Sequence, residues 1–361
     1  MRTVWLQSET TIKGRGAATP FPHRFESLQR EVQDDGWPRD DEPSVAHPPT
    51  QVELVQAGQI LSRNHSPDIP FELAINPYRG CEHGCIYCYA RPTHSYLNLS
   101  PGLDFETRLF AKMDAPQALR TALASQRYMP RSLCIGSATD AYQPIERRLR
   151  LTRGLIEVLA ECRHPFLLIT KSSAVERDVN LLASMAEFVS VQITLTTLDP
   201  ELARRLEPRA SSPQRRLLTI RRLTEAGLGV GVSVSPIIPF VNEPELERIL
   251  GAAREAGAVE AWTIPLRLPW EVAPLFEDWL RRHLPDRADR VLARLRDLRG
   301  GRLNVARFGS RFRGEGIWAD LLRQRFDKAC GRLGLSRRGR EPDFSQFRRP
   351  AAGVSAQAEL F

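Results

Sequence analysis

Short apolar runs and longer amphipathic stretches alternate along the chain from residue 71. The apolar runs predict strands buried on both faces, because they contain few polar positions. The stretches between them repeat apolar residues at helical spacing. The expected strands are Phe71–Ile75, Leu133–Gly136, Phe166–Thr170, Val189–Leu195, Val230–Ile237 and Trp262–Leu266. The expected helices cover about 115–127, 145–162, 175–186, 213–226 and 243–256.

Capping and stop signals support several of these helices. Asn242 is expected to cap the helix at 243–256, and Asp199 with Pro200 is expected to open another short helix. Gly227 and Gly257 fall where helices should end. Strands that alternate with helices predict an α/β fold, here a partial (β/α)6 TIM-type barrel of parallel strands. In that architecture the chemistry lies at the carboxyl ends of the strands.

The pattern divides the chain into four parts. Residues 1–70 contain eight of the 27 prolines and no sustained periodicity, which predicts a poorly ordered leader. Within the leader, residues 14–27 mix Arg, Pro and Phe and either dock on the main domain or stay solvated. The other parts are the partial barrel at 71–266, a helical basic extension at 267–335 with helices near 270–283, 286–299 and 317–333, and a tail at 336–361.

Positive charge is concentrated near the C-terminus. The 361 residues include 51 Lys+Arg and 43 Asp+Glu, a formal charge of +8, and only four of the basic residues are lysines. Residues 281–349 alone hold 19 arginines and one lysine against eight acids, a charge of +12. This region is a candidate surface for nucleic acid.

Aromatic residues are interleaved with the arginines of this basic region. They are Phe308, Phe312, Trp318 and Phe326 beside Arg307, Arg311, Arg313 and Arg323. Such a surface can stack bases and contact phosphates. An amphipathic helix whose aromatics close the barrel explains the same composition.

No apolar run approaches the roughly 18 residues of a membrane-spanning helix, and the first residues lack the apolar core of a signal peptide. We therefore expect a cytoplasmic protein with no membrane partner. Six cysteines are too few for a disulfide scaffold, so they are expected to be buried thiols, metal ligands or catalytic groups.

Three of the cysteines, Cys81, Cys85 and Cys88, form a C-x3-C-x2-C cluster shortly after the first expected strand. Thiolates are the ligands of iron–sulfur clusters, and three of them on one loop can hold three irons of a cubane and leave the fourth open. The alternative is a structural zinc site with His83 or His94 as fourth ligand, in a non-catalytic nucleic-acid-binding protein.

This motif after the first strand of a β/α barrel resembles the signature of radical S-adenosylmethionine (SAM) enzymes. Cys88-Tyr89, the run Gly136–Asp140 and the run Thr170–Ser172 are similar to the spore photoproduct lyase branch of that superfamily. The resemblance implies a [4Fe–4S] cluster on the three cysteines, SAM on the open iron, and an external one-electron donor of flavodoxin or ferredoxin type. It also implies a 5′-deoxyadenosyl radical that abstracts hydrogen, with a nucleic acid as one possible substrate.

The resemblance also suggests which side chains contact SAM. These candidates follow the cysteines or the next strands along the chain, and they are Tyr87, Tyr89, Ser137, Thr139, Asp140, Lys171, Ser172 and Arg209. Structural roles compete with several of them: Thr139 or Asp140 can cap a helix, and Arg209 can form a surface ion pair.

One position departs from the family pattern. Spore photoproduct lyase carries a hydrogen-donating cysteine in the loop after the second strand, and this chain has Ser137 there. A hydroxyl is a poor hydrogen-atom donor beside a thiol. The departure puts the thymine-dimer reaction itself in doubt and does not affect the radical SAM assignment.

Overall fold

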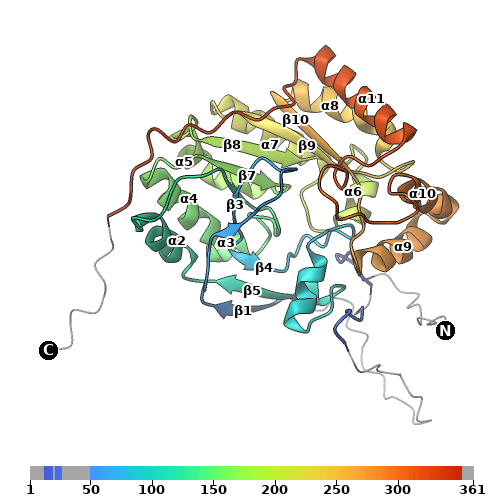
Figure 1. The fold of residues 1–361 in the computed structure, drawn as a ribbon, viewed down its shortest axis with the longest axis horizontal. Coiled ribbons are helices and arrows are strands. Elements are labelled where there is room, and N and C mark those ends of the chain that lie inside the picture. Colours follow the sequence, from blue (N-terminus) through green and yellow to red (C-terminus); the bar gives the residue numbers. More distant parts are fainter. Residues whose placement is uncertain (1–11, 19–20, 27–48, 352–361) are drawn as a thin grey trace, which may run out of the picture.

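A seven-stranded sheet forms the centre of the computed structural model, which describes residues 12–18, 21–26 and 49–351 (Figure 1). In sheet order its strands are β10 (Glu260–Pro265), β9 (Val230–Ile237), β8 (Val189–Thr194), β7 (Phe166–Thr170), β6 (Leu133–Ile135), β3 (Leu73–Ile75) and β2 (Ser62–Arg63). Strand β2 pairs antiparallel with β3, and the other pairs are parallel. The α/β class expected from the sequence is confirmed, with β7 and β9 at their predicted bounds.

Helices connect the parallel strands and cover the sheet. They are α2 (Ala115–Ala124), α3 (Glu146–Leu149), α4 (Leu151–Glu161), η2 (Ser173–Asp178), α5 (Val179–Ala183), α6 (Pro200–Leu206), α7 (Pro213–Glu225), η3 (Glu243–Glu245) and α8 (Leu246–Glu255). Helices α2, α4 and α5 lie along one side of the sheet, and α8 lies near β9 and β10 (Figure 1). Asp199 caps α6 as predicted, because its carboxylate accepts from the backbone N–H groups of Glu201 (2.8 Å) and Leu202 (3.3 Å).

Asn242 does not cap the helix at 243–256, contrary to the sequence-based expectation. Its side-chain amide is buried and bonds to three backbone groups instead. It accepts from the Ile238 N–H (2.6 Å) and donates to the carbonyls of Thr196 (2.7 Å) and Pro236 (2.9 Å). The bridge between the ends of β8 and β9 satisfies groups that would otherwise be buried without a partner.

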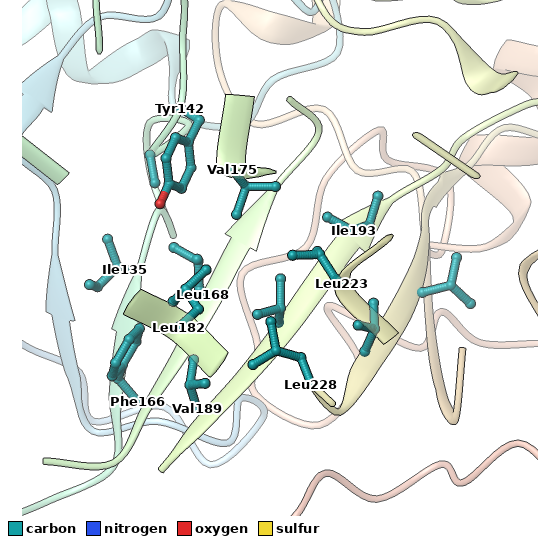
Figure 2. Close-up of a cluster of buried hydrophobic side chains, with 14 of the residues drawn as sticks. Ile135, Tyr142, Phe166, Leu168, Val175, Leu182, Val189, Ile193, Leu223 and Leu228 are labelled. Carbon is teal, nitrogen blue, oxygen red and sulfur yellow. The ribbon is translucent and has the colours of Figure 1, made fainter. Parts of the chain in front are cut away.

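Apolar side chains fill the space between the sheet and its helices. Figure 2 shows Ile135, Leu168 and Ile193 on the strands facing Leu182 and Leu223 on the helices. All five are fully buried. This packing fixes the strand ends that carry the candidate site.

The described part of residues 1–70 has strands and contacts with the main domain, whereas the sequence predicted a poorly ordered leader. Its strand β1 (Gln51–Val55) pairs with β5 (Arg108–Lys112), which also pairs with β4 (Tyr78–Arg79) in a second, three-stranded sheet. Residues 12–18 and 21–26 dock on the main domain, the first of the two possibilities left open for 14–27. Phe21, for example, exchanges two hydrogen bonds with Ser100, at 2.6 and 2.8 Å. The remaining leader positions lie outside the described residues.

The basic extension is helical as predicted, with α9 (Val272–His283), α10 (Pro285–Asp297) and α11 (Ile317–Leu333). Helices α9 and α10 pack together, and α11 packs on α8 and β10 (Figure 1). Trp318 and Phe326 belong to the core here, as the alternative reading of the aromatic residues expects.

The described residues of the tail are also part of the fold. Ser336 continues the sheet beyond β10, and its carbonyl accepts from the Ala261 N–H at 2.8 Å. Phe344 and Phe347 lie edge-on to the buried ring of His164. None of the helices in the part of the chain described here is long and apolar enough to cross a membrane.

Candidate active site

The cysteine loop, residues 80–88, lies just beyond the carboxyl end of β3, after the short strand β4. Cys81 and Cys85 are buried, and Cys88 is partly exposed. The Cys81 N–H donates to the Phe105 carbonyl (2.9 Å), which fastens the start of the loop. Gly80 and Gly84 have φ angles of +79° and +66°, a conformation that glycine adopts without strain.

The three thiols lie close enough to interact electrostatically. Burial raises the pKa of Cys85 to about 12, although the positive charge of Lys171 opposes the shift. Burial, the Asp140 carboxylate and the Cys85 thiol raise the pKa of Cys81 well above its usual value. The loop thus gathers three thiols, two of them buried, and their ionised forms call for a cationic partner.

The two histidines named as a possible fourth zinc ligand lie against other groups. His83 Nδ1 lies 3.3 Å from Asp140 Oδ2, and His94 Nε2 lies 2.9 Å from the Arg108 carbonyl oxygen. Within residues 12–18, 21–26 and 49–351, no three His, Cys, Asp or Glu side chains converge as a single ion requires. A cubane binds each thiolate through a different iron, so the donor set fits an iron–sulfur cluster without such convergence.

Asp140 joins the ends of β6 and β7 to the cysteine loop. Its carboxylate accepts from the Thr170 hydroxyl (2.6 Å), the Lys171 N–H (2.9 Å) and the Tyr142 N–H (2.8 Å). Burial raises the pKa of Asp140, but His83 and these donors outweigh it and the pKa falls below the usual range. The sequence did not predict this joining role.

Lys171 and Tyr87 meet over a buried carboxylate, that of Glu207. Lys171 Nζ lies 3.5 Å from Glu207 Oε1 and donates to the Tyr87 hydroxyl oxygen at 3.3 Å. The Tyr87 hydroxyl and Arg216 also bond to Glu207. Burial raises the pKa of Glu207, but Arg216 and Lys171 outweigh it and lower it to about 2. The structure therefore brings two candidates predicted from the sequence, Tyr87 and Lys171, together in one charged cluster, although they lie in different loops.

The remaining candidates after β6 and β7 lie at the same edge. Asn76 donates to the Ser137 hydroxyl (3.3 Å) and accepts from the Thr139 N–H (3.2 Å). The Tyr89 hydroxyl bonds to the Ser137 carbonyl, while Ser172 caps η2 by accepting from the Ala174 N–H (3.2 Å). Tyr89, which directly follows Cys88, thus links the end of the cysteine loop to the residues after β6.

Arg209 lies on the outer side of the cysteine loop. Its guanidinium is 3.2 Å from Glu82 Oε1 and donates to the Thr50 hydroxyl at 3.3 Å. The Arg209 N–H also faces the His83 carbonyl at 3.4 Å. This is the ion-pair alternative left open for Arg209 in the sequence, with a residue of the cysteine loop as its partner.

Several buried residues of this region were missed from the sequence. They are Glu82, Arg91, Glu106, Gln143 and Arg216, together with the partly buried Asn76. Each is an isolated polar residue in its own segment, and 47 arginines hide the two that are buried here. The position of Arg91, three residues after the last cysteine of the cluster, was the one local signal that could have found one of them.

Aromatic rings and guanidinium groups alternate from Tyr89, next to the cysteine loop and 48% exposed, to Phe308. Arg267 lies over the rings of Tyr89 (5.3 Å to the centroid) and Phe312 (5.0 Å). Arg311 lies over Phe312 (4.6 Å) and Phe308 (4.7 Å), and Phe308 is 55% exposed. We call these five residues the aromatic–arginine ladder.

A cavity of about 80 Å³ lies at the opposite edge of the sheet. Its lining comes from the amino ends of β6, β7 and β8 and from the tail, including Leu133, Phe166, Val189 and Arg340. None of the candidate site residues lines it. The cavity is therefore separate from the cysteine loop.

Comparison with known proteins identifies the family. Residues 75–253 match the radical SAM superfamily. The protein Rv2578c of Mycobacterium tuberculosis is 37% identical over 234 residues, which cover 64% of this chain and 68% of that protein. The protein MJ0683 of Methanocaldococcus jannaschii is 28% identical over 180 residues, 50% of this chain and 65% of that protein. The chain belongs to the radical SAM superfamily.

The fold is similar to solved structures of spore photoproduct lyase. The structure of that enzyme complexed with dinucleoside spore photoproduct has 16% sequence identity and a TM-score of 0.54, and covers 79% of this chain and 81% of the enzyme. Radical SAM enzymes use a [4Fe–4S] cluster and SAM, and these are the cofactors of this protein. The protein is thus a radical SAM enzyme.

Proposed function

We propose that Cys81, Cys85 and Cys88 hold three irons of the [4Fe–4S] cluster and leave the fourth for SAM. The observation that carries this proposal is the gathering of three interacting thiols on one loop at the carboxyl edge of the parallel sheet. At that edge barrel enzymes place their chemistry. When bound there, the cluster would supply one electron for the cleavage of SAM into methionine and the 5′-deoxyadenosyl radical that takes hydrogen from a substrate.

The chain's own residues bind and orient SAM in this proposal. Lys171, with 14% of its side chain exposed, holds the SAM carboxylate beside Ser172. Ser137 and Thr139 face the amino end of SAM. Tyr87 and Tyr89 lie against the cluster and the adenosyl group. Hydrogen bonds within the protein already orient the polar groups of these side chains. The side chains therefore need little reorganisation when SAM binds.

Asp140 and Arg209 act through the cysteine loop rather than on SAM. Asp140 is saturated with donors from the ends of β6 and β7, and Arg209 pairs with Glu82. Both therefore fix the loop against the strand ends. An external donor of flavodoxin or ferredoxin type reduces the cluster.

Release of 5′-deoxyadenosine tests the proposal. The full chain is reconstituted anaerobically with iron and sulfide, then given dithionite and SAM. Wild type should contain about four irons per chain and release 5′-deoxyadenosine, whereas Cys85→Ala should lose both properties. Cys162→Ala, a buried thiol in a distant helix turn, is the matched control and should retain both. Wild type that binds one zinc and no iron would refute the proposal.

We further propose that the substrate is a nucleic acid. The aromatic–arginine ladder supports this, because it offers an exposed ring and guanidinium groups on a path to Tyr89. Exposed Arg302 and Arg313 lie in the same loop region and add positive charge. Bases stack on such rings, and phosphates bind to such charges.

Single-stranded oligonucleotides test the substrate class. Phe308→Ala should weaken binding of a fluorescent 12-mer by about 5–100-fold, the loss expected for one stacked base. Leu321→Ala, a comparably exposed apolar residue on α11, is the control and should bind like wild type. Equal binding by both variants, or binding that does not weaken with salt, would refute the nucleic-acid proposal.

A further inference from the structure

Leader residues Gly16 and Ala17 bond to a fully buried carboxylate beside the cysteine loop. That carboxylate is Glu106, in the short helix α1 (Asp104–Thr107). Its two oxygens accept from the backbone N–H groups of Gly16 and Ala17, each at 2.9 Å. Arg15 adds a bond from its guanidinium to the Glu106 carbonyl at 2.8 Å. We call residues 15–17 the leader clamp.

The same carboxylate holds a buried arginine that grips the cysteine loop. Arg91 Nη2 lies 2.5 Å from Glu106 Oε1, and neither side chain is exposed. Arg91 donates from Nε to the Cys85 carbonyl and from Nη2 to the Gly84 carbonyl, both at 2.9 Å. The leader clamp is therefore linked to the backbone of Cys85 through only two side chains.

Gly16 also contacts the loop directly. A Cβ atom at position 16 would lie 1.9 Å from the Gly84 carbonyl oxygen and 3.2 Å from Arg91 Nη2. Real Cβ atoms do not approach a backbone oxygen that closely, so position 16 admits only glycine while the clamp is seated.

A second anchor holds the leader to α9 and to the helix after the cysteine loop. Arg24 Nη1 lies 2.9 Å from both carboxylate oxygens of Glu271, just before α9. The same guanidinium lies over the rings of Trp270 (4.6 Å) and Tyr96 (5.0 Å). Tyr96 belongs to η1 (Arg91–Leu97), the helix that directly follows the cysteine loop.

We infer that the leader clamp is a positioning element for the cluster ligands, holding the backbone of Gly84 and Cys85 through Glu106 and Arg91. The inference rests on the proposed function, in which Cys85 is a cluster ligand. Without the clamp, the Glu106 carboxylate loses two of its donors inside the protein, and a buried charge with missing partners favours local opening. The loop would then present its thiols less uniformly and release the cluster sooner.

Gly16→Ala tests the inference in the full-length chain. The added methyl group must push the clamp off the loop, whereas Gly58→Ala, with nothing within 4 Å of the new Cβ, is the matched control. Arg24→Ala removes the second anchor and serves if Gly16→Ala folds poorly, because Arg24 is partly exposed. The first measurement is hydrogen exchange of residues 84–91 in cluster-free protein, which needs no iron.

Exchange at 84–91 should be about tenfold faster in Gly16→Ala than in wild type, as expected for the loss of a charge-assisted hydrogen bond. Arg24→Ala should show a smaller increase and Gly58→Ala none. The second measurement is the half-life of bound iron under a chelator, which should shorten in the same order.

Unchanged exchange in both Gly16→Ala and Arg24→Ala would overturn the inference. Faster exchange with unchanged iron retention would overturn the positioning role and leave the clamp a contact of the leader alone. A third outcome is that wild type takes up no iron while hydrogen exchange at 84–91 is still faster in Gly16→Ala and Arg24→Ala. In that case the proposed function fails, and the contact of the leader clamp with the cysteine loop is still supported. The two failures are therefore distinguishable.

Discussion

Replacing Glu207 by glutamine removes the charge from a carboxylate that four polar side chains surround. Arg216, Lys171, Tyr87 and Thr196 all bond to it or pair with it, and its side chain is fully buried. Glutamine keeps the shape and leaves the Arg216 guanidinium, 1% exposed, without its anionic partner. The substitution therefore tests the electrostatic cohesion of the site with little change in packing.

Two independent considerations set the magnitude. Removing one partner of a buried ion pair costs about 3–5 kcal/mol. The fall in the pKa of Glu207 from 4.5 to about 2 corresponds to roughly 3 kcal/mol of stabilisation of the charged form, at about 1.4 kcal/mol per pKa unit. Glu207→Gln should thus lower the free energy of unfolding by about 3 kcal/mol at pH 7.

Urea unfolding of cluster-free protein measures this loss. Glu201→Gln is the matched control, because Glu201 lies on the neighbouring helix α6 and forms an exposed pair with Arg204. Such a pair contributes less than about 1 kcal/mol.

The pH dependence gives a second check. Since the folded pKa of Glu207 lies below its unfolded value, its stabilisation is fully present above about pH 4.5 and is lost as the pH falls toward 2. The difference between wild type and Glu207→Gln should therefore be constant from about pH 7 to 5 and shrink below. A loss under about 1 kcal/mol, or a difference that grows on acidification, would refute the reasoning.

Three further substitutions probe the site and the sheet. Lys171→Met should weaken SAM binding about tenfold or more, because a charge-assisted bond is lost, and should leave the iron content unchanged. Lys328→Met is the control and should bind SAM like wild type. Equilibrium dialysis measures SAM binding by both variants. Asn242→Ala should lower the free energy of unfolding by about 2–4 kcal/mol, because three backbone groups lose their partner, as measured by urea unfolding. Gly231→Ala should cost about 1–3 kcal/mol in the same assay, since its Cβ would lie 2.2 Å from the Trp262 ring.

Each of these has a contradicting result. Equal SAM affinity in both lysine variants would remove Lys171 from the proposed SAM site. An Asn242→Ala variant with an unchanged free energy of unfolding would contradict the bridging role, because water would then serve the three backbone groups equally well. Gly229→Ala, with nothing within 4 Å, is the control for Gly231→Ala, and equal stability of the two would contradict the close packing.

The sequence predicts the parallel sheet well because its signal is local. The runs at β7 (FLLIT) and β9 (VGVSVSPI) are rich in apolar and β-branched residues and are bounded by turn residues, so even their ends were predictable. The second sheet escaped prediction because β4 has two residues and β1, with its sequence QVELV, is mostly exposed. Such strands are defined by their partners and not by their own pattern.

The site divides in the same way. The cysteine cluster is recognisable because its ligands are close in sequence, and Lys171 stands out in a chain with four lysines. Glu106 bonds to Gly16 and Ala17, which lie far away in the chain, and Arg216 bonds to Thr194 and Glu207 in the preceding elements. A single charged residue carries no periodicity. The capping role predicted for Asn242 failed because three backbone groups compete for its amide.

The described residues nearest the two termini cover opposite edges of the sheet. Residues 15–17 lie at the carboxyl edge, while Phe344 and Phe347 lie on His164, whose pKa burial lowers to about 4, toward the amino edge. Trimming the protein to its catalytic barrel is therefore not neutral at either end. A chain that starts at residue 27 would expose the carboxylate of Glu106, and a chain that stops at 335 would leave an imidazole uncovered, so shortened versions are poor substitutes for the intact polypeptide.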